Sequence, residues 1–358
     1  MLVFPVRRVF AQLSHIRTFS VTFRTCAESR RRPRETTRPL QPSSSSRSAP
    51  PRQRSKKTAR YIPLEKWNPI LYEDRAILVL NKPPGYSVQA NTPDPNERML
   101  IGELTSEYLR ERGLDCPVFH CHRIDKRTTG ALLCAKSTHT LRDITQQFAT
   151  RKIDKTYLAL LHPAQDIGVS GTIDQDVGFR DGRPCIMTNG RPGLPAVTHW
   201  ELLATSPIAS VKLVKFMPET GRKHQIRLHA SRILKAPILG DDLYTDVVRP
   251  GRDIKELLSQ YRYGTLFLHS ASISLTRFRK TGPKKMFRLG LTAPVPQYWI
   301  DACKALKIAI PKEYTQSGVF VDGERVENGI VEGVEGRLIH GSRNITTAVT
   351  APSPRDTQ

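Results

Sequence analysis

The sequence has little of what secreted, metal-binding and membrane proteins depend on. Its 358 residues include six cysteines, and no two of them form a C-x-x-C pair. We therefore expect neither a disulfide framework nor a zinc site. No run of about 18 or more apolar residues occurs, so no membrane-spanning helix is expected. No internal repeat is visible. These absences together favour a soluble protein that acts inside the cell.

Acidic residues are also scarce, with 33 Asp and Glu against 56 Lys and Arg. Residues 1–60 hold 15 basic and 2 acidic residues, which leaves 41 against 31 for the remainder. The remainder therefore still carries a net charge of about +10. This balance favours a polyanionic partner, because each Lys or Arg near a phosphate releases condensed counterions. Charge alone does not separate RNA, DNA and anionic lipid.

The N-terminal 60 residues have two compositions. Residues 1–27 contain four arginines and no Asp or Glu, with hydroxylated residues among apolar ones. This composition is typical of a mitochondrial transit peptide, whereas a secretory signal would need an unbroken apolar centre. The alternative is a disordered basic tail that binds RNA non-specifically. Residues 28–60 are rich in Arg, Pro and Ser and are interpreted as a disordered linker.

Beyond the linker, short apolar runs separated by turn residues predict a mixed α/β domain with many strands and few helices. Ser137 is placed to cap a helix that carries Leu141, Ile144 and Phe148 on one face. We predict this domain over residues 61–302 and a C-terminal extension of unknown role over residues 303–358. The predicted strands lie near residues 75–82, 131–135, 155–161, 196–203 and 211–216, and a second helix lies over residues 224–234.

One carboxylate lies where the chain enters a predicted buried strand. It is Asp125 of His122-Arg123-Ile124-Asp125, and the small residues that follow it, Thr128–Gly130, would let another backbone approach. Such a carboxylate can line a cleft, although an Asp in a turn more often accepts hydrogen bonds from local backbone N–H groups. A kinase catalytic loop is excluded because Ile124 separates Arg123 from Asp125 and no glycine-rich phosphate loop precedes it.

The segment HRIDKRTTGALLCAK (His122–Lys136) resembles the signature H-R-L-D-x-x-T-S-G-x-L-L-x-A-K of the RluA-type pseudouridine synthases. Further segments resemble the other family motifs in the same order, and together they cover roughly residues 61–299. One departure is Ser270, which stands where the family usually has Ala. These further segments are DRAILVLNKPPG (Asp74–Gly85), KTYLAL (Lys155–Leu160), ETGRKHQIRLHA (Glu219–Ala230) followed by GDDLY (Gly240–Tyr244), and FLHSASI (Phe267–Ile273).

The resemblance implies an α/β (α+β) fold built on a large mixed, mostly antiparallel sheet with a central active-site cleft. It also implies a role for several residues of this chain. Asp125 matches the catalytic aspartate, Tyr157 the tyrosine that stacks on the target uracil, and Arg227 the arginine that pairs with the aspartate. Arg123 matches a residue that is associated in this family with the gap left in the RNA when the target base flips out of the helix. Lys82 and Pro83 match a motif that supports the active-site loop.

The reaction that the resemblance implies breaks the N1–C1′ glycosidic bond of uridine, rotates the uracil and rejoins it through C5. It needs neither metal nor cofactor. Asp125 could attack the sugar, attack the base or remove a ribose proton, and Tyr157 is a candidate to help remove the C5 proton. The expected partner is structured RNA, with mitochondrial large-subunit ribosomal RNA favoured over transfer RNA, and the expected compartment is the mitochondrial matrix.

Less specific interpretations exist for each of these residues. Tyr157 could serve strand packing, and Arg227 could form a salt bridge on a helix surface. His224 and His229 could suggest a metal, but side chains five apart on a helix diverge. His122 and His269 are expected to be hydrogen-bonded structural residues. For the whole protein, the alternatives are a non-catalytic RNA-binding ribosome-assembly factor with the same fold and a metal-dependent nuclease.

Overall fold

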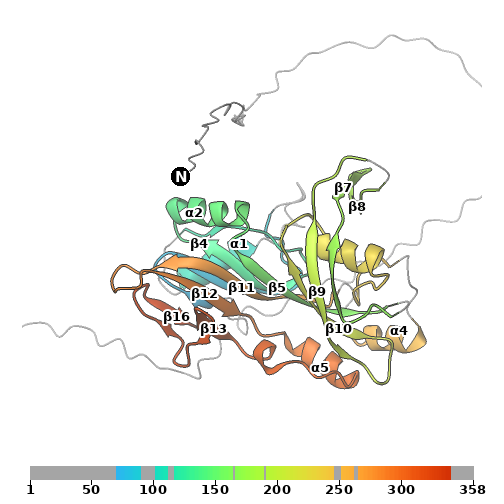
Figure 1. Cartoon of the computed structure of the whole chain (residues 1–358). Coiled ribbons are helices and arrows are strands. Elements are labelled where there is room, and N and C mark those ends of the chain that lie inside the picture. Colours follow the sequence, from blue (N-terminus) through green and yellow to red (C-terminus); the bar gives the residue numbers. More distant parts are fainter. Residues whose placement is uncertain are drawn as a thin grey trace, which may run out of the picture. The chain divides into compact units, whose positions relative to one another are not determined.

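A 14-stranded sheet forms the centre of the computed structural model (Figure 1). The structure describes residues 70–89, 101–111, 117–163, 166–188, 191–245, 251–261 and 265–339. The predicted transit peptide and linker, residues 1–60, lie outside the described residues. No helix in the described part of the chain is both long enough and apolar enough to cross a membrane.

The first half of the chain supplies two helices and most of the central strands. The predicted strands near residues 75–82, 131–135 and 155–161 are all present. The elements are β1 (Ile70–Glu73), β2 (Ile77–Lys82), α1 (Ile101–Glu111), β3 (Phe119–His120), β4 (Thr129–Ala135), α2 (Thr138–Ala149), β5 (Asp154–Leu161), β6 (Ser170–Asp174), β7 (Val177–Arg180) and β8 (Arg183–Ile186).

The second half completes the sheet and adds the remaining helices. The predicted strands near residues 196–203 and 211–216 are also present. The elements are β9 (Val197–Thr205), β10 (Lys212–Pro218), α3 (Gln225–Leu228), the π-helix η3 (His229–Ile233), α4 (Arg252–Ser259), β11 (Leu268–Phe278), β12 (Met286–Thr292), α5 (Gln297–Ala305), the 3-10 helix η4 (Lys312–Tyr314), β13 (Gly318–Val321), β14 (Glu324–Arg325), β15 (Ile330–Val331) and β16 (Gly336–Leu338).

The main path of the sheet runs β15-β16-β1-β2-β4-β11-β5-β10-β9-β6, and β7 and β8 form a separate two-stranded sheet. β12 pairs with β11 and β13, β14 pairs with β13, and β3 pairs with β4. β4 and β11 run parallel, whereas the other strand pairs of the described residues are antiparallel. The expected large, mixed and mostly antiparallel sheet is confirmed.

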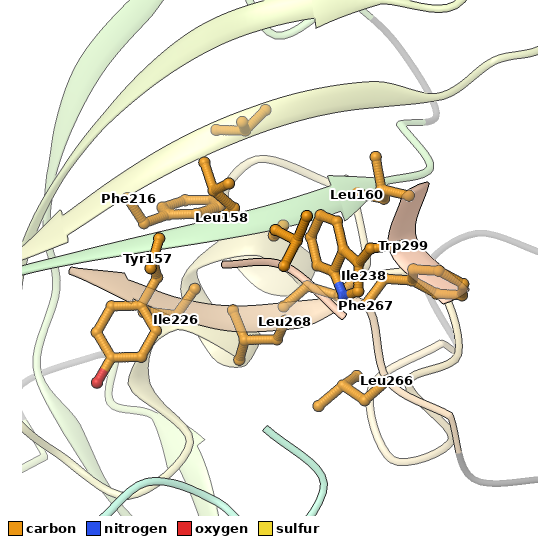
Figure 2. Close-up of a cluster of buried hydrophobic side chains, with 14 of the residues drawn as sticks. Tyr157, Leu158, Leu160, Phe216, Ile226, Ile238, Leu266, Phe267, Leu268 and Trp299 are labelled. Atoms are coloured by element: carbon orange, nitrogen blue, oxygen red, sulfur yellow. The ribbon is translucent and has the colours of Figure 1, made fainter. Parts of the chain in front are cut away.

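The central strands are buried on both faces, which explains why they appear in the sequence as nearly continuous apolar runs. In β2, Leu78 and Leu80 join one hydrophobic core while Ile77 and Val79 join a second one. The first core includes the large side chains around Trp299 of α5 that Figure 2 shows. The second includes Ile144 of α2, so α5 and α2 cover opposite faces of the sheet, as Figure 1 also shows.

Two local predictions about helices are confirmed in outline. α2 begins after Ser137, whose hydroxyl oxygen accepts a hydrogen bond from the Thr140 N–H at 3.2 Å. The helix predicted over residues 224–234 is present, but its second part, η3, has π geometry. There the Leu234 N–H donates to the His229 carbonyl, five residues back. π segments are rare and often occur beside functional sites.

The sheet continues beyond residue 302, where the predicted catalytic domain ends. β13 pairs with β12, and β16 pairs with β1, the first described strand of the chain. Val319, Val331 and Val334 are buried in the second core. The predicted boundary therefore does not mark the end of the sheet, and residues 318–338 share its core.

Candidate active site

A cleft of about 530 Å³ opens between the loop before β4 and the segment from β10 to α3. The predicted site residues Arg123, Asp125, Tyr157 and Arg227 all line it, although they come from three separate parts of the sequence. The described residues hold no group of three or more His, Cys, Asp or Glu side chains that could bind a metal ion. His224 lines the cleft too, and it approaches Asp125 rather than His229.

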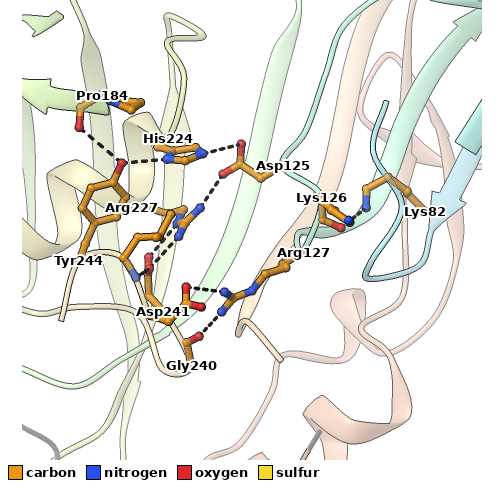
Figure 3. A network of polar contacts seen from close by, with 12 residues as sticks. Lys82, Asp125, Lys126, Arg127, Pro184, His224, Arg227, Gly240, Asp241 and Tyr244 are labelled. Carbon is orange, nitrogen blue, oxygen red and sulfur yellow. Dashed lines mark hydrogen bonds and ion pairs between the residues drawn. The ribbon is translucent and has the colours of Figure 1, made fainter. Parts of the chain in front are cut away.

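The loop that carries Asp125 is held from both sides. The Thr128 N–H donates to the Asp125 carbonyl at 3.0 Å and closes a turn. The ammonium of Lys82, which is fully buried, donates to the carbonyls of Pro83, Tyr86 and Lys126 at 2.8, 3.0 and 3.0 Å. Figure 3 shows the contact with Lys126. Three acceptors match the three donors of an ammonium. This arrangement suits the ammonium form of Lys82, although burial lowers its pKa to about 7.

Arg227 contacts two carboxylates at different distances. Its Nε and Nη2 donate to the two oxygens of Asp241 at 2.7 Å each, and its Nη1 lies 3.5 Å from Asp125 Oδ2 (Figure 3). Arg227 and Asp241 are 4% and 2% exposed. The arginine therefore has a buried bidentate partner that the sequence did not predict, and its third nitrogen faces Asp125. This geometry fixes the guanidinium and directs it toward the Asp125 carboxylate.

His224 lies between Asp125 and the hydroxyl of Tyr244 and approaches both with its ring nitrogens. Its Nδ1 lies 2.8 Å from the Tyr244 hydroxyl, and its Nε2 lies 3.9 Å from Asp125 Oδ1 (Figure 3). His224 has a left-handed backbone, with φ of 58°, which turns the chain into α3. Burial lowers the pKa of His224, against the opposing effect of Asp125, which favours the neutral imidazole.

Tyr157 projects from β5 toward the cleft and is almost fully buried (Figure 2). Its strand is fixed by pairing of Tyr157 with Phe216 of β10 and with Ser270 of β11. Burial raises the pKa of the Tyr157 hydroxyl to about 12, so the phenol is neutral at pH 7. A neutral aromatic face at the wall of a cleft is suited to stacking on a nucleobase.

Arg123 differs from the other predicted residues because it is exposed at the cleft. Its Nη1 donates to the Gln89 side-chain oxygen at 2.9 Å. The two histidines predicted to be structural are hydrogen-bonded. His122 Nε2 accepts from the Leu133 N–H at 2.9 Å, and His269 lies 2.9 Å from the Thr129 hydroxyl and 3.1 Å from the Ala293 carbonyl.

Sequence reasoning did not assign a role to Asp241 or Tyr244, and it considered His224 only as a metal ligand. The available signal is the segment Gly240–Tyr244, which matches the family but for whose residues the resemblance implied no roles. The two acidic residues of this segment have different environments and different partners. Asp241 is buried against Arg227, whereas Asp242 is partly exposed and pairs with Arg127.

Residues 76–232 match the family described as RNA pseudouridylate synthase. A tRNA pseudouridine synthase C of Pectobacterium carotovorum subsp. carotovorum is 31% identical over 218 residues, which cover 58% of this chain and 54% of that protein. A ribosomal large subunit pseudouridine synthase C of Rickettsia bellii is 34% identical over 235 residues, which cover 64% of this chain and 69% of that protein.

Two further matches come from mammals. A protein of Bos taurus named pseudouridylate synthase RPUSD4, mitochondrial, is 28% identical over 272 residues, which cover 68% of this chain and 70% of that protein. The solved structure of human RNA pseudouridylate synthase domain containing 4 is similar, with a TM-score of 0.53 and 26% identity. That match covers 68% of this chain and 94% of the solved chain.

Proposed function

The chain belongs to the RNA pseudouridylate synthase family, and on that premise we propose that it isomerises uridine in RNA to pseudouridine with Asp125 as the catalytic carboxylate. The observation that carries the proposal is the convergence of Asp125, Tyr157 and Arg227 on one cleft. The same cleft presents more basic than acidic side chains, which suits an RNA substrate.

Each residue has a physical role in this proposal. A uracil inside a helix must leave the stack before it can turn over, which costs a few kcal/mol. Stacking on Tyr157 offsets part of this cost, by about 1–3 kcal/mol. Arg123, exposed at the cleft, fills the gap left in the RNA with a planar cation. Arg227 holds Asp125 in place through a guanidinium that Asp241 fixes.

The reaction balances without a further reactant, because pseudouridine is an isomer of uridine. The N1–C1′ bond breaks, the C5–C1′ bond forms, C5 loses a proton and N1 gains one. Asp125 acts at the sugar or the base in one of three ways, as a nucleophile toward C1′, as a nucleophile toward the uracil ring, or as a base toward a ribose proton. The hydroxyl of Tyr157 assists removal of the C5 proton.

We propose mitochondrial large-subunit ribosomal RNA as the substrate and mitochondrial transfer RNA as the second candidate. The name of the Rickettsia bellii relative supports the first, and that of the Pectobacterium relative supports the second. Pseudouridine mapping of mitochondrial RNA from cells with and without this protein tests the proposal. We expect loss of one or a few sites in the large ribosomal RNA. An unchanged map in every mitochondrial RNA would contradict it.

The proposed compartment is the mitochondrial matrix, reached through residues 1–27. The acid-free, arginine-bearing composition of this segment supports import, and so does the name of the Bos taurus relative. A fluorescent reporter that carries residues 1–27 should enter mitochondria. A reporter confined to cytosol or nucleus would contradict the localisation without affecting the chemistry.

Two alternatives make different predictions. A non-catalytic ribosome-assembly factor would bind RNA but leave its uridines unchanged, and the joint presence of Asp125, Tyr157 and Arg227 argues against it. A metal-dependent nuclease would cleave RNA and lose activity with a chelator. Isomerisation by the proposed mechanism should continue in EDTA, because no step in it uses a metal ion.

A further inference from the structure

Lys155 is a half-buried lysine in the wall of the cleft. It lies on β5 two residues before Tyr157, and because side chains alternate along a strand, both project to the same face. Its ammonium donates to the Thr220 carbonyl at 3.3 Å. Within the described part of the chain, no carboxylate lies within the 4.0 Å of an ion pair with Lys155, and its neighbour Asp154 pairs with Arg288.

Two other cations of the cleft, by contrast, have carboxylate partners. Arg227 has Asp241 and Asp125, and Arg151 has Glu219 at 3.4 Å. A cation that is buried without a counter-ion destabilises a fold. Burial lowers the pKa of Lys155 to about 8, which leaves most of the side chain protonated at pH 7. The cleft thus holds a positive charge that an incoming anion can neutralise.

We propose that the Lys155 ammonium binds a phosphodiester group next to the target uridine. This inference rests on the proposed function, in which the uracil stacks on Tyr157. Two residues along a strand separate side chains by about 6.6 Å. The ribose connects the stacked base to its phosphates, so a cation at that offset from Tyr157 meets the backbone of the same nucleotide. A lysine is a compact point charge and a common phosphate ligand.

The competing interpretation is that Lys155 only holds the Thr220 carbonyl and shapes the loop that leads into α3. Two substitutions separate the interpretations. Lys155→Met removes both the charge and the hydrogen bond, whereas Lys155→Gln removes the charge but keeps a donor for Thr220. A phosphate ligand requires both variants to lose affinity for RNA. A purely structural residue requires the Gln variant to behave like the wild type.

Binding of a short fluorescent single-stranded RNA with one central uridine, measured over a salt series, provides the first readout. Each phosphate contact contributes about 0.7 to the slope of log affinity against log salt for single strands. We expect both Lys155 variants to lose about that much slope and roughly tenfold in affinity at low salt. Lys152→Met is the matched control, because Lys152 is exposed and outside the cleft lining. It should bind like the wild type.

The second readout locates the phosphate. The same RNA is prepared with a neutral methylphosphonate either 5′ or 3′ of the uridine. One of these positions should weaken the wild type and leave Lys155→Gln unaffected. The inference would be overturned if Lys155→Gln showed the salt slope of the wild type. It would also be overturned if each methylphosphonate weakened RNA binding equally in the wild type and in Lys155→Gln.

Because this test measures binding alone, it remains interpretable if no isomerisation is found. Absence of pseudouridine would contradict the proposed function, and an unchanged salt slope would contradict the role of Lys155. The two failures are therefore separate results.

Discussion

At the scale of single residues, the site depends on the guanidinium of Arg227, which contacts one buried carboxylate and one partly exposed carboxylate. Asp241 is buried and bonded twice to Arg227, whereas Asp125 is partly exposed and lies farther from it. Asp241 thereby fixes Arg227, and Asp125 remains open to the cleft. The two carboxylates thus have the environments that the proposed function assigns to a structural acid and a catalytic one.

Asp241→Asn tests this division. It leaves a buried guanidinium without its charged partner, which typically costs about 3–5 kcal/mol in free energy of unfolding. We expect a loss of this size in denaturant titration together with loss of activity. The matched control is Asp242→Asn, whose side chain is 42% exposed, and it should cost no more than about 1 kcal/mol. Equal effects of the two substitutions would contradict the account.

Tyr157 provides a test that depends on pH. Burial raises the pKa of the Tyr157 hydroxyl to about 12, so the phenol is neutral at pH 7. Below this pKa, the fraction of phenolate, the form that accepts a proton, rises roughly tenfold for each pH unit. Single-turnover rates with saturating enzyme should therefore rise from about pH 7 to pH 9. Tyr157→Phe should bind RNA as well as the wild type and react more slowly, with that rise lost. Equal rates in both proteins would restrict Tyr157 to stacking.

At the scale of elements, the parallel contact between β4 and β11 positions the Asp125 loop. Gly130 lies at this contact with φ of 102°, and a Cβ there would collide with the Ser270 backbone oxygen. The sequence predicted that Thr128–Gly130 would permit close approach of another backbone, and this is confirmed. It did not indicate that the approaching strand comes from about 140 residues away.

Gly130→Ala should therefore destabilise the protein more than a change at an uncrowded glycine. Gly85 is the matched control, because its φ of 92° is equally unusual while a Cβ there meets nothing within 4 Å. Gly85→Ala should cost about 1–3 kcal/mol from backbone strain alone. Gly130→Ala should cost clearly more or prevent soluble expression. Similar unfolding midpoints would show that the strand contact is not close.

Prediction from sequence succeeded where structure depends on local pattern. β2, β4 and β5 are apolar runs bounded by turn residues, and Ser137 begins α2 through a local hydrogen bond. Local pattern failed where a contact joins distant segments, and it was the family resemblance that predicted the approach of Arg227 to Asp125. Nothing near Asp241 indicates that its partner is Arg227, and nothing near His224 indicates that Asp125 lies beside it.

At the scale of the whole molecule, the two ends of the described chain meet in one sheet. β16 pairs with β1, and the short strands β13–β16 bury valines in the second core. Their sequence is polar and rich in glycine, and its apolar pieces are too short to show a period. The prediction therefore ended the catalytic domain at residue 302, because sequence pattern alone does not reveal pairing with a strand at residue 70.

Two truncations test this architecture. A chain that ends after residue 302 should express insolubly or melt at a much lower temperature, because it exposes β1 and β12 and removes Val319, Val331 and Val334 from the core. A chain that ends after residue 339 keeps every described strand and should melt close to the full-length protein. Equal melting temperatures for the two truncations would show that β13–β16 are dispensable.

The most direct test of the central claim measures pseudouridine formation by Asp125→Asn in the RNA whose sites depend on this protein. The substitution is nearly isosteric and removes the charge that Arg227 faces. We predict that the wild type forms pseudouridine, whereas the variant forms none while it remains folded and binds the RNA with similar affinity, since phosphate contacts and stacking on other residues supply the binding. Normal pseudouridine formation by Asp125→Asn would contradict the account of this active site.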